Sequence, residues 1–368
     1  MFFRFRRKVF ISLIFFFFTT AYTSEKPVEF NIFNSSYIYN GENASYWEET
    51  RYTLTYLEDL FQPYFTLKSG NVIFKIGIGL LFPFNQEEKL ISYYPYFQTR
   101  YTLDDFVFII GVIDNDHDFP PCILDPLVRM TPKVRIVNTD QIPIDYESFP
   151  TGIFTHGFYE YGVQIKSSND FLKLDTYLNW QLPDTSLHRE RFDIGLIVSL
   201  YSFYTGIHYW HNGGHENFHP VEVTENYVAS LGLKEKNFSL FYLVSYWLPD
   251  RDRYPEKNVL GQAIYIEGNF EFFGINIQPQ FFITSAFIFK EQSFISVEGD
   301  PFYRVPLYVG LNFSKVWNFG QNFIELKFVN GTFLPDTSTG WNPMMIRYDQ
   351  KIQFNFNHKF EISTLSKS

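Results

Sequence analysis

The chain has 368 residues and a net charge of -10, and its 45 Phe, 26 Tyr and 6 Trp make 21% of it aromatic. No basic stripe follows the first eight residues, which argues against a nucleic-acid partner. The single cysteine, Cys122, excludes an internal disulfide. The mean hydropathy of -0.15 is too polar for a helical membrane protein but fits strands with one apolar and one polar face.

The N-terminus has the pattern of a secretory signal peptide, which we place at residues 1–24. A basic segment, Met1–Lys8, precedes the apolar run Val9–Phe18 and the small, mostly polar segment Thr19–Ser24. The apolar run is about half the length that a helix needs to span a bilayer. The sequence therefore predicts export.

The segments that follow are short and alternate between apolar and polar residues. In Phe171–Gln181, one face carries Leu172, Leu174, Thr176, Leu178 and Trp180, and the other carries Lys173, Asp175, Tyr177, Asn179 and Gln181. This period of two is typical of strands with one face in lipid and one in water. About 17 or 18 such segments fit a closed antiparallel transmembrane β-barrel of about 16 strands (range 14–18), since each tilted strand needs about 9–11 residues to span. We place it at residues 25–362, followed by a C-terminal tail at 363–368.

The connections between these segments are of two kinds. Short polar turns such as Lys68–Asn71, Lys166–Asp170 and Lys234–Asn237 predict hairpins at one end of the barrel. The long stretches Asp114–Pro150, Trp210–Glu225, Leu248–Val259 and Thr332–Met345 predict loops at the other end. We expect the first of these to fold into the mouth and narrow it.

The polar face of the strands predicts a lumen that small polar solutes can cross. Its candidate solute-binding residues are Asp175, Asn179, Gln181, Arg191 and Asp193 on strands and Arg129, Arg135 and Arg189 in connections. Acidic and basic groups facing each other across a lumen would orient polar solutes. Loop charges near lipid headgroups, which need no pore function, are an equal alternative for the basic residues. The predicted function is accordingly a porin-like channel for passive passage of small polar solutes.

Two patterns resemble parts of metal sites, although we predict no cofactor. His208, His211 and His215 could ligate a transition metal, but Gly213-Gly214 favours a loop over the helix that would align them. Asp114, Asp116 and Asp118 alternate as in half of a calcium loop, without the glycine and glutamate that complete it. An exposed loop is the explanation that we favour for both patterns.

The chain carries no recognisable nucleophile motif. Serine, His156 and Asn179 are present, but no GxSxG stands in the sequence, and we therefore predict that the protein is not an enzyme. The enzymatic alternative would be lipid hydrolysis that is lost on changing one Ser or His.

The chain resembles bacterial outer-membrane β-barrel proteins over Glu25–Phe360. Like them it ends on a strand with a late aromatic residue, Phe360, which implies the barrel-assembly machinery as a partner. Three stretches resemble uncharacterised outer-membrane proteins of Gram-negative bacteria: Ile123–Leu127, Tyr161–Gln164, and Asn179–Gln181 leading to His188–Phe192, extended by His208–His215. That family implies no catalytic residue.

Two alternatives to the channel remain open. One is a partner-dependent export barrel for a polysaccharide or lipid, and the other is a plugged, surface-binding barrel. In each case we expect location in the outer membrane, contact with its lipid, and possible homo-oligomers.

Overall fold

The computed structural model describes residues 28–45, 51–84, 92–124, 159–182, 190–213, 223–249, 251, 255–285, 287, 294–299, 303, 305–334 and 345–362. The predicted signal peptide, the C-terminal tail and most of the Asp114–Pro150 loop lie outside these residues. Among the described residues, no helix has the length and the apolar character needed to cross a bilayer.

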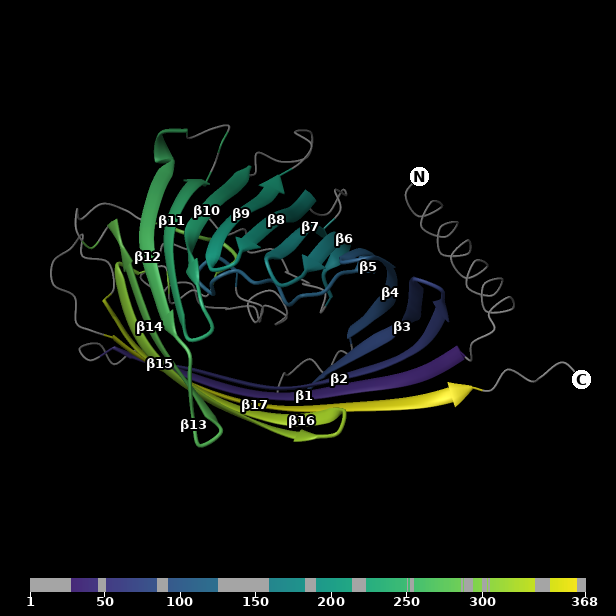
Figure 1. Cartoon of the computed structure of the whole chain (residues 1–368). Helices are drawn as coiled ribbons and strands as arrows, with labels where there is room; N and C mark the ends of the chain where they lie inside the picture. The colour runs from purple at the N-terminus through teal and green to yellow at the C-terminus, as the bar shows by residue number, and fades with distance from the viewer. Residues whose placement is uncertain are drawn as a thin grey trace, which may run out of the picture.

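The described chain forms one antiparallel sheet that closes on itself (Figure 1). Each strand pairs with its neighbours in the chain, and β1 pairs with both β2 and β17, so the barrel has no free edge. The strands are β1 Val28–Ser45, β2 Arg51–Ser69, β3 Val72–Pro83, β4 Ser92–Leu103, β5 Phe106–Val112, β6 Tyr161–Ser168, β7 Leu172–Leu182, β8 Glu190–Leu200, β9 Phe203–Gly213, β10 Thr224–Lys234, β11 Phe238–Leu248, β12 Val259–Gly268, β13 Phe270–Phe272, β14 Ile275–Thr284, β15 Leu307–Phe319, β16 Asn322–Leu334 and β17 Met345–Ile362, with a short 3-10 helix, η3, at Pro255–Lys257.

Strands β12 and β13 act as one strand of the barrel wall. Both pair with β14 in a single register, with Glu267 opposite Gln280 and Phe270 opposite Ile277. Between these pairs lies Pro279 of β14, which has no N–H to donate to the ladder. The seventeen strands therefore build a barrel of sixteen, which confirms the predicted fold class and strand number.

Strand β2 is one of the longest strands of the barrel. The alternation of the sequence predicts two separate segments there, Arg51–Leu57 and Gln62–Lys68, but the residues between them continue the pairing with β1 and join them into one strand.

The connections confirm the predicted asymmetry of the two ends. Two-residue turns follow β2, β4, β8 and β15, and Gly70 and Gly320 take the positive φ that such tight turns need. The connections at the opposite end are longer, and β5 and β6 are joined by the longest, residues 113–160.

The burial pattern places the apolar residues outside and the polar residues inside, as predicted for β7 and β8. In β8, Ile194, Leu196 and Leu200 are exposed on the outer face, and Arg191 and Asp193 are buried on the inner face. An apolar outer wall of this kind is suited to lipid.

The inside of the barrel holds a packed apolar core. The coil after β5 runs through the interior (Figure 1) and contributes Phe119 and Ile123, and the connection after β14 contributes Ile295. They pack against inward side chains from at least five strands, among them Tyr204, Phe241, Tyr265, Phe282 and Tyr308. A barrel of this width is not filled by its own side chains alone, and here the connections supply the rest.

The two inner segments are also hydrogen-bonded to each other and to the wall. Ser296 Oγ donates to the carbonyl of Ile123 at 2.6 Å. Asn226 of β10 holds the second segment twice: its Nδ2 donates to the Ile295 carbonyl at 3.2 Å, and its Oδ1 accepts from Val297 N at 3.1 Å. We call residues 113–124 and 294–299 the inner plug.

Ion pairs anchor the first inner segment to the wall. Asp114 pairs with Arg100 at 2.6 Å, Asp116 pairs with Lys166 at 2.5 Å, and Asp118 pairs with Lys234. Partial desolvation beside the wall would raise the pKa of Asp116, but the hydrogen bond and the positive charge of Lys166 outweigh it and hold that pKa below its usual value. The alternating carboxylates thus reach three different cations and do not converge on a calcium ion.

Candidate functional site

Strand β9 carries a histidine on each face of the barrel wall. His208 points inward, with none of its side chain exposed, and lies 3.4 Å from Asp193 Oδ2. His211 points outward, where it belongs to a polar cluster on a face that is otherwise apolar. Three residues apart on a strand, the two must lie on opposite faces.

The outward cluster forms because the register of β9 and β10 sets Glu225 directly opposite His211. His211 Nδ1 lies 3.3 Å from Glu225 Oε1. The next pair toward the barrel centre is Tyr209 and Tyr227, whose hydroxyls donate to Oε1 and Oε2 of Glu225 at 3.1 and 3.0 Å. One carboxylate thus gathers three side chains from two strands.

A cation completes the cluster from the connection after β11. Arg251 N donates to the Val223 carbonyl at 2.9 Å, and Thr224 Oγ1 donates to the Pro249 carbonyl at 3.0 Å. These two bonds hold the connection against the start of β10. Arg251 Nη1 then lies 2.7 Å from Glu225 Oε1.

A carboxylate on the outer face of such a barrel is energetically unfavourable unless it is fully bonded. Only 5% of the Glu225 side chain is exposed, and an ionised group there loses its hydration. Ionisable residues within a membrane-facing surface are rare and usually belong to a functional site. The four partners of Glu225 therefore mark a candidate functional site rather than ordinary wall surface.

Gly213 and Phe192 are the neighbours of the His211 ring on the side of its second nitrogen, Nε2, and on its face. Gly213 lies beside the ring, and a Cβ there would come within 3.0 Å of Nε2. Phe192 covers the other side, with ring centroids 5.0 Å apart. Among the described residues no hydrogen bond engages Nε2, so a histidine oriented by a carboxylate presents a free nitrogen that can accept a proton.

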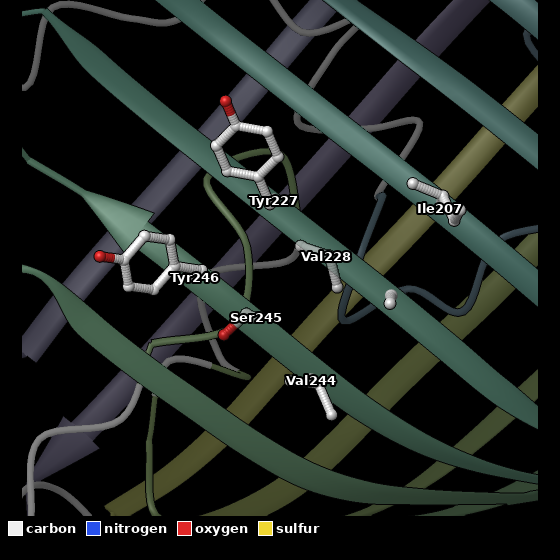
Figure 2. A pocket seen from close by; sticks show the side chains of 7 residues that line it. Ile207, Tyr227, Val228, Val244, Ser245 and Tyr246 are labelled. Carbon is white, nitrogen blue, oxygen red and sulfur yellow. The ribbon is translucent and has the colours of Figure 1, made fainter. Parts of the chain in front are cut away.

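An apolar depression lies on the same outer face, next to the cluster. It spans β9, β10 and β11, has a volume of about 230 Å³, and is lined by Ile207, Tyr227, Ala229, Val244 and Tyr246 with the backbone of their neighbours. Figure 2 shows Ile207 and Val244 on two sides of it and the rings of Tyr227 and Tyr246 on a third. Tyr227 belongs to both the depression and the polar cluster.

The predicted solute-binding residues occupy the inner face. Asp193 accepts hydrogen bonds from Asn179 at 2.8 Å and Gln181 at 3.0 Å. Gln181 also reaches Glu298 of the inner plug at 3.4 Å, and Arg191 packs on Trp210. These side chains bond to one another and to the plug, and their predicted role in binding a solute stays a prediction.

Asp175, the fifth of these strand residues, belongs to a second inner group. His117 of the inner plug places Nδ1 2.8 Å from Asp175 and Nε2 3.0 Å from Glu160, and its ring stacks on Tyr177. This group locks the plug to β7. Arg129, Arg135 and Arg189 lie outside the described residues.

The hypothetical histidine metal site does not form from the residues that the structure places. His208 and His211 lie on opposite faces of β9, so they cannot share an ion, and His215 lies outside the described residues. The described parts of the chain contain no group of three potential ligands arranged for a metal.

Sequence reasoning missed Glu225, Tyr209 and Arg251. It assigned 210–225 to a loop, whereas β9 continues to Gly213 and β10 already begins at Thr224. Ile207 and Tyr209 alternate with inward residues, and continuing this alternation by two residues places His211 on the lipid-facing side. A polar or ionisable residue on that side indicates a functional site, and this is the signal in the sequence that could have identified His211.

The fold and this cluster define an outer-membrane β-barrel with a polar site on its lipid-facing wall. The chain matches the family model described as Lipid A 3'-O-deacylase-type over residues 20–364, and it belongs to that family.

Solved structures similar to this chain include porins. A triple mutant of the Rhodopseudomonas blastica porin has a TM-score of 0.46 at 12% identity and covers 88% of this chain and 100% of that one. A double mutant of the same porin has a TM-score of 0.48 at 12% identity with the same coverage. At these values the likeness has no bearing on function. No curated protein sequence matches the chain.

The family corrects two predictions. The passive channel is wrong as the main function, and so is the expectation that the protein is not an enzyme, because the family is described by an enzyme activity. The channel prediction rested on the inward polar side chains, and the prediction of no enzyme rested on the lack of a serine nucleophile motif. A histidine and a glutamate from two strands, outside the barrel, have no local sequence motif.

Proposed function

We propose that the protein is a lipid deacylase that hydrolyses an acyl ester, in keeping with the 3'-O-deacylation of lipid A that describes its family. The observation that carries this proposal is the His211–Glu225 pair, with Arg251, on the lipid-facing wall. A lipid in the bilayer can reach this face by lateral diffusion, without entering the barrel.

The chemistry needs one general base and one water molecule. Nε2 of His211 takes a proton from water as the water oxygen attacks the ester carbonyl carbon. The bond between that carbon and the sugar oxygen then breaks, and the imidazolium returns the proton to the departing oxygen. The products are a fatty acid and a free hydroxyl group.

Glu225 is a positioning residue in this scheme. Its Oε1 is 3.3 Å from Nδ1 of His211, so it fixes the ring with Nε2 outward and stabilises the imidazolium as it forms. The hydroxyl groups of Tyr209 and Tyr227 donate hydrogen bonds to the carboxylate and hold it in place. Among the described residues no serine is hydrogen-bonded to His211, which favours water over a serine as the nucleophile.

Arg251 supplies positive charge where the lipid headgroup would lie. Its side chain is 45% exposed, although one nitrogen is bonded to Glu225. A guanidinium offers several donors in a planar fork that suits phosphate and carboxylate groups. We assign Arg251 to the anionic headgroup.

The height of the cluster on the barrel suits an ester. His211 and Glu225 lie near the end of the barrel that carries the long connections. Along their strands they are two residues closer to that end than the outward tyrosines Tyr209 and Tyr227, which lie in one row with Tyr246. Aromatic girdles of membrane barrels lie at the bilayer interfaces, and lipid ester groups lie at the same level.

The test is hydrolysis by the purified, refolded barrel in mixed micelles with lipid A, followed by mass spectrometry of the released fatty acid. His211→Gln should lower the rate at least about 100-fold, as expected for loss of a general base. His358→Gln, on the exposed outer surface of β17, is the matched control and should keep the wild-type rate. A His211→Gln variant with full activity would overturn the proposal, as would a folded wild-type protein that cleaves neither lipid A nor simpler acyl esters.

Export and assembly belong to the same proposal. The signal at residues 1–24 would direct the chain across the inner membrane, and the barrel-assembly machinery would insert residues 25–362 in the outer membrane. The support is the order of charged, apolar and polar residues at the N-terminus and the late aromatic residue Phe360 on β17.

A further inference from the structure

We infer that the depression on the outer face of β9–β11 is an acyl-chain subsite, and that Ala229 determines which chain lengths are hydrolysed. The inference rests on the proposed function, since it assigns the substrate chain of that same site. Its evidence is independent of the chemistry, because it comes from the shape and composition of the wall.

The register of the three strands arranges the outward side chains in rows. The polar row holds His211 and Glu225. The next row toward the barrel centre holds Tyr209, Tyr227 and Tyr246, and the row after that holds Ile207, Ala229 and Val244.

Ala229 makes the depression because it is small among large neighbours. Along β10 its outward neighbours are Tyr227 and Leu231, and across the sheet they are Ile207 and Val244. Ile207 and Tyr227 are exposed on the outer face and line the depression, so their side chains form its rim and Ala229 forms its floor.

The depression lies at the right depth for a chain whose ester is at His211. Ala229 is four residues beyond Glu225 on β10, which is about 13 Å along a strand at the usual rise per residue. The direction runs from the bilayer interface toward the hydrocarbon core. An extended acyl chain that begins at the polar row would pass between the tyrosine rings and reach Ala229 with carbons far from its ester.

The size and lining of the depression indicate that it binds part of an acyl chain and not a whole ligand. Its volume of about 230 Å³ is below the roughly 300 Å³ at which pockets begin to enclose a drug-sized molecule. Its lining is almost entirely carbon. Because lipid tails are as apolar as this surface, the chain gains little hydrophobic free energy by moving there, and the selectivity must come from shape.

The first experiment measures hydrolysis of butanoyl, decanoyl and tetradecanoyl esters of the glucosamine 3-hydroxyl by the full-length barrel in mixed micelles. Ala229→Leu fills the floor of the depression and should lower the rate of hydrolysis of the two longer esters about tenfold. This is the lower end of the loss in rate that the addition or removal of one methylene group causes in an apolar pocket. The butanoyl ester should be unaffected, because its chain is too short to reach Ala229.

Thr176→Leu is the matched control. Thr176 faces outward on β7 in the same row as Ala229, connected through Leu196 and Ile207, but it is three strands away. This variant adds similar bulk at the same depth and should leave all three rates unchanged. If Ala229→Leu lowers the three rates equally, or none of them, the inference is overturned.

A second measurement does not depend on hydrolysis. A tetradecanoyl ester with a terminal diazirine, photolysed with the barrel, should label peptides from β10 and β11, and Ala229→Leu should abolish that labelling. Labelling spread evenly around the barrel overturns the subsite. A barrel that is labelled at β10 and β11 but hydrolyses none of the esters keeps the subsite and refutes the proposed function instead.

Discussion

The two faces of β9 place two histidines in opposite surroundings. His208, on the inner face, has no exposed side-chain surface and lies beside Asp193, which is itself bonded to Asn179 and Gln181. His211, on the outer face, is partly exposed and lies beside Glu225, and within the described residues only its Nδ1 has hydrogen-bond partners. The same pairing of histidine and carboxylate thus occurs once in a closed core and once on an accessible wall.

Polar groups support the fold on the inner face of the wall and the proposed chemistry on its outer face. Inside the barrel, polar side chains satisfy each other and the plug, as buried polar groups must. Outside, Glu225 needs four bonded partners, since a carboxylate on the lipid-facing wall loses its hydration. A polar group retained on such a surface is better explained by function than by folding.

The strongest test of this contrast replaces each of the two carboxylates, Glu225 outside and Asp193 inside, with the corresponding amide. Glu225→Gln should lower the rate of ester hydrolysis at least about 100-fold, because the amide no longer stabilises an imidazolium at His211. Asp193→Asn should leave hydrolysis per folded molecule unchanged. It should instead lower the urea midpoint of unfolding, since it disturbs a buried hydrogen-bond network. The comparison breaks if both variants lose activity equally or if Asp193→Asn lowers only activity.

A truncation in the inner plug tests the structural half of the comparison. Ile123 is fully buried in the apolar core, and Ile123→Ala should lower the free energy of unfolding by about 2–5 kcal/mol. Hydrolysis by the molecules that remain folded should be unaffected, because the plug lies on the other side of the wall. An unchanged unfolding midpoint would show that the plug adds nothing to the stability of the barrel.

Removal of the positive charge of Arg251 should have a smaller effect, and it should weaken substrate binding. Arg251→Ala should raise KM for anionic lipids about tenfold, with little change in kcat, because it removes a charge-assisted contact to the headgroup. A neutral ester substrate provides the control and should show the wild-type KM. A fall in kcat for both substrates would instead place Arg251 in the support of Glu225.

The smallest expected effect is a loss of stability in acid at the anchor of the inner plug. The lowered pKa of Asp116 means that its pair with Lys166 stabilises the fold above the carboxyl's usual pKa, and that this contribution disappears as the pH falls through the lowered value. With 72% of the Asp116 side chain exposed, solvent screens the pair, and we expect less than about 1 kcal/mol. The unfolding midpoint of Asp116→Asn should therefore match the wild type in strong acid and fall slightly below it at neutral pH.

Sequence reasoning worked best where the information is local. The alternation of Leu172–Gln181 predicted which side chains of β7 face outward, and the strand count of sixteen followed from segment length. It failed at 210–225, where the histidines and glycines suggested a loop. In the structure, the pairing of β9 with β10 extends one residue beyond His211, to Asn212 opposite Thr224, and β9 itself ends at Gly213.

The sequence by itself determined the class of protein, because period-two alternation, aromatic content and connection lengths are properties of neighbouring residues. The tertiary structure decided the site. His211 meets Glu225 only through the strand register, Arg251 joins them only through the connection after β11, and Ala229 forms a hollow only because two other strands place larger side chains beside it. A register shift of one residue would leave the alternation of each strand intact and would separate every one of these partners.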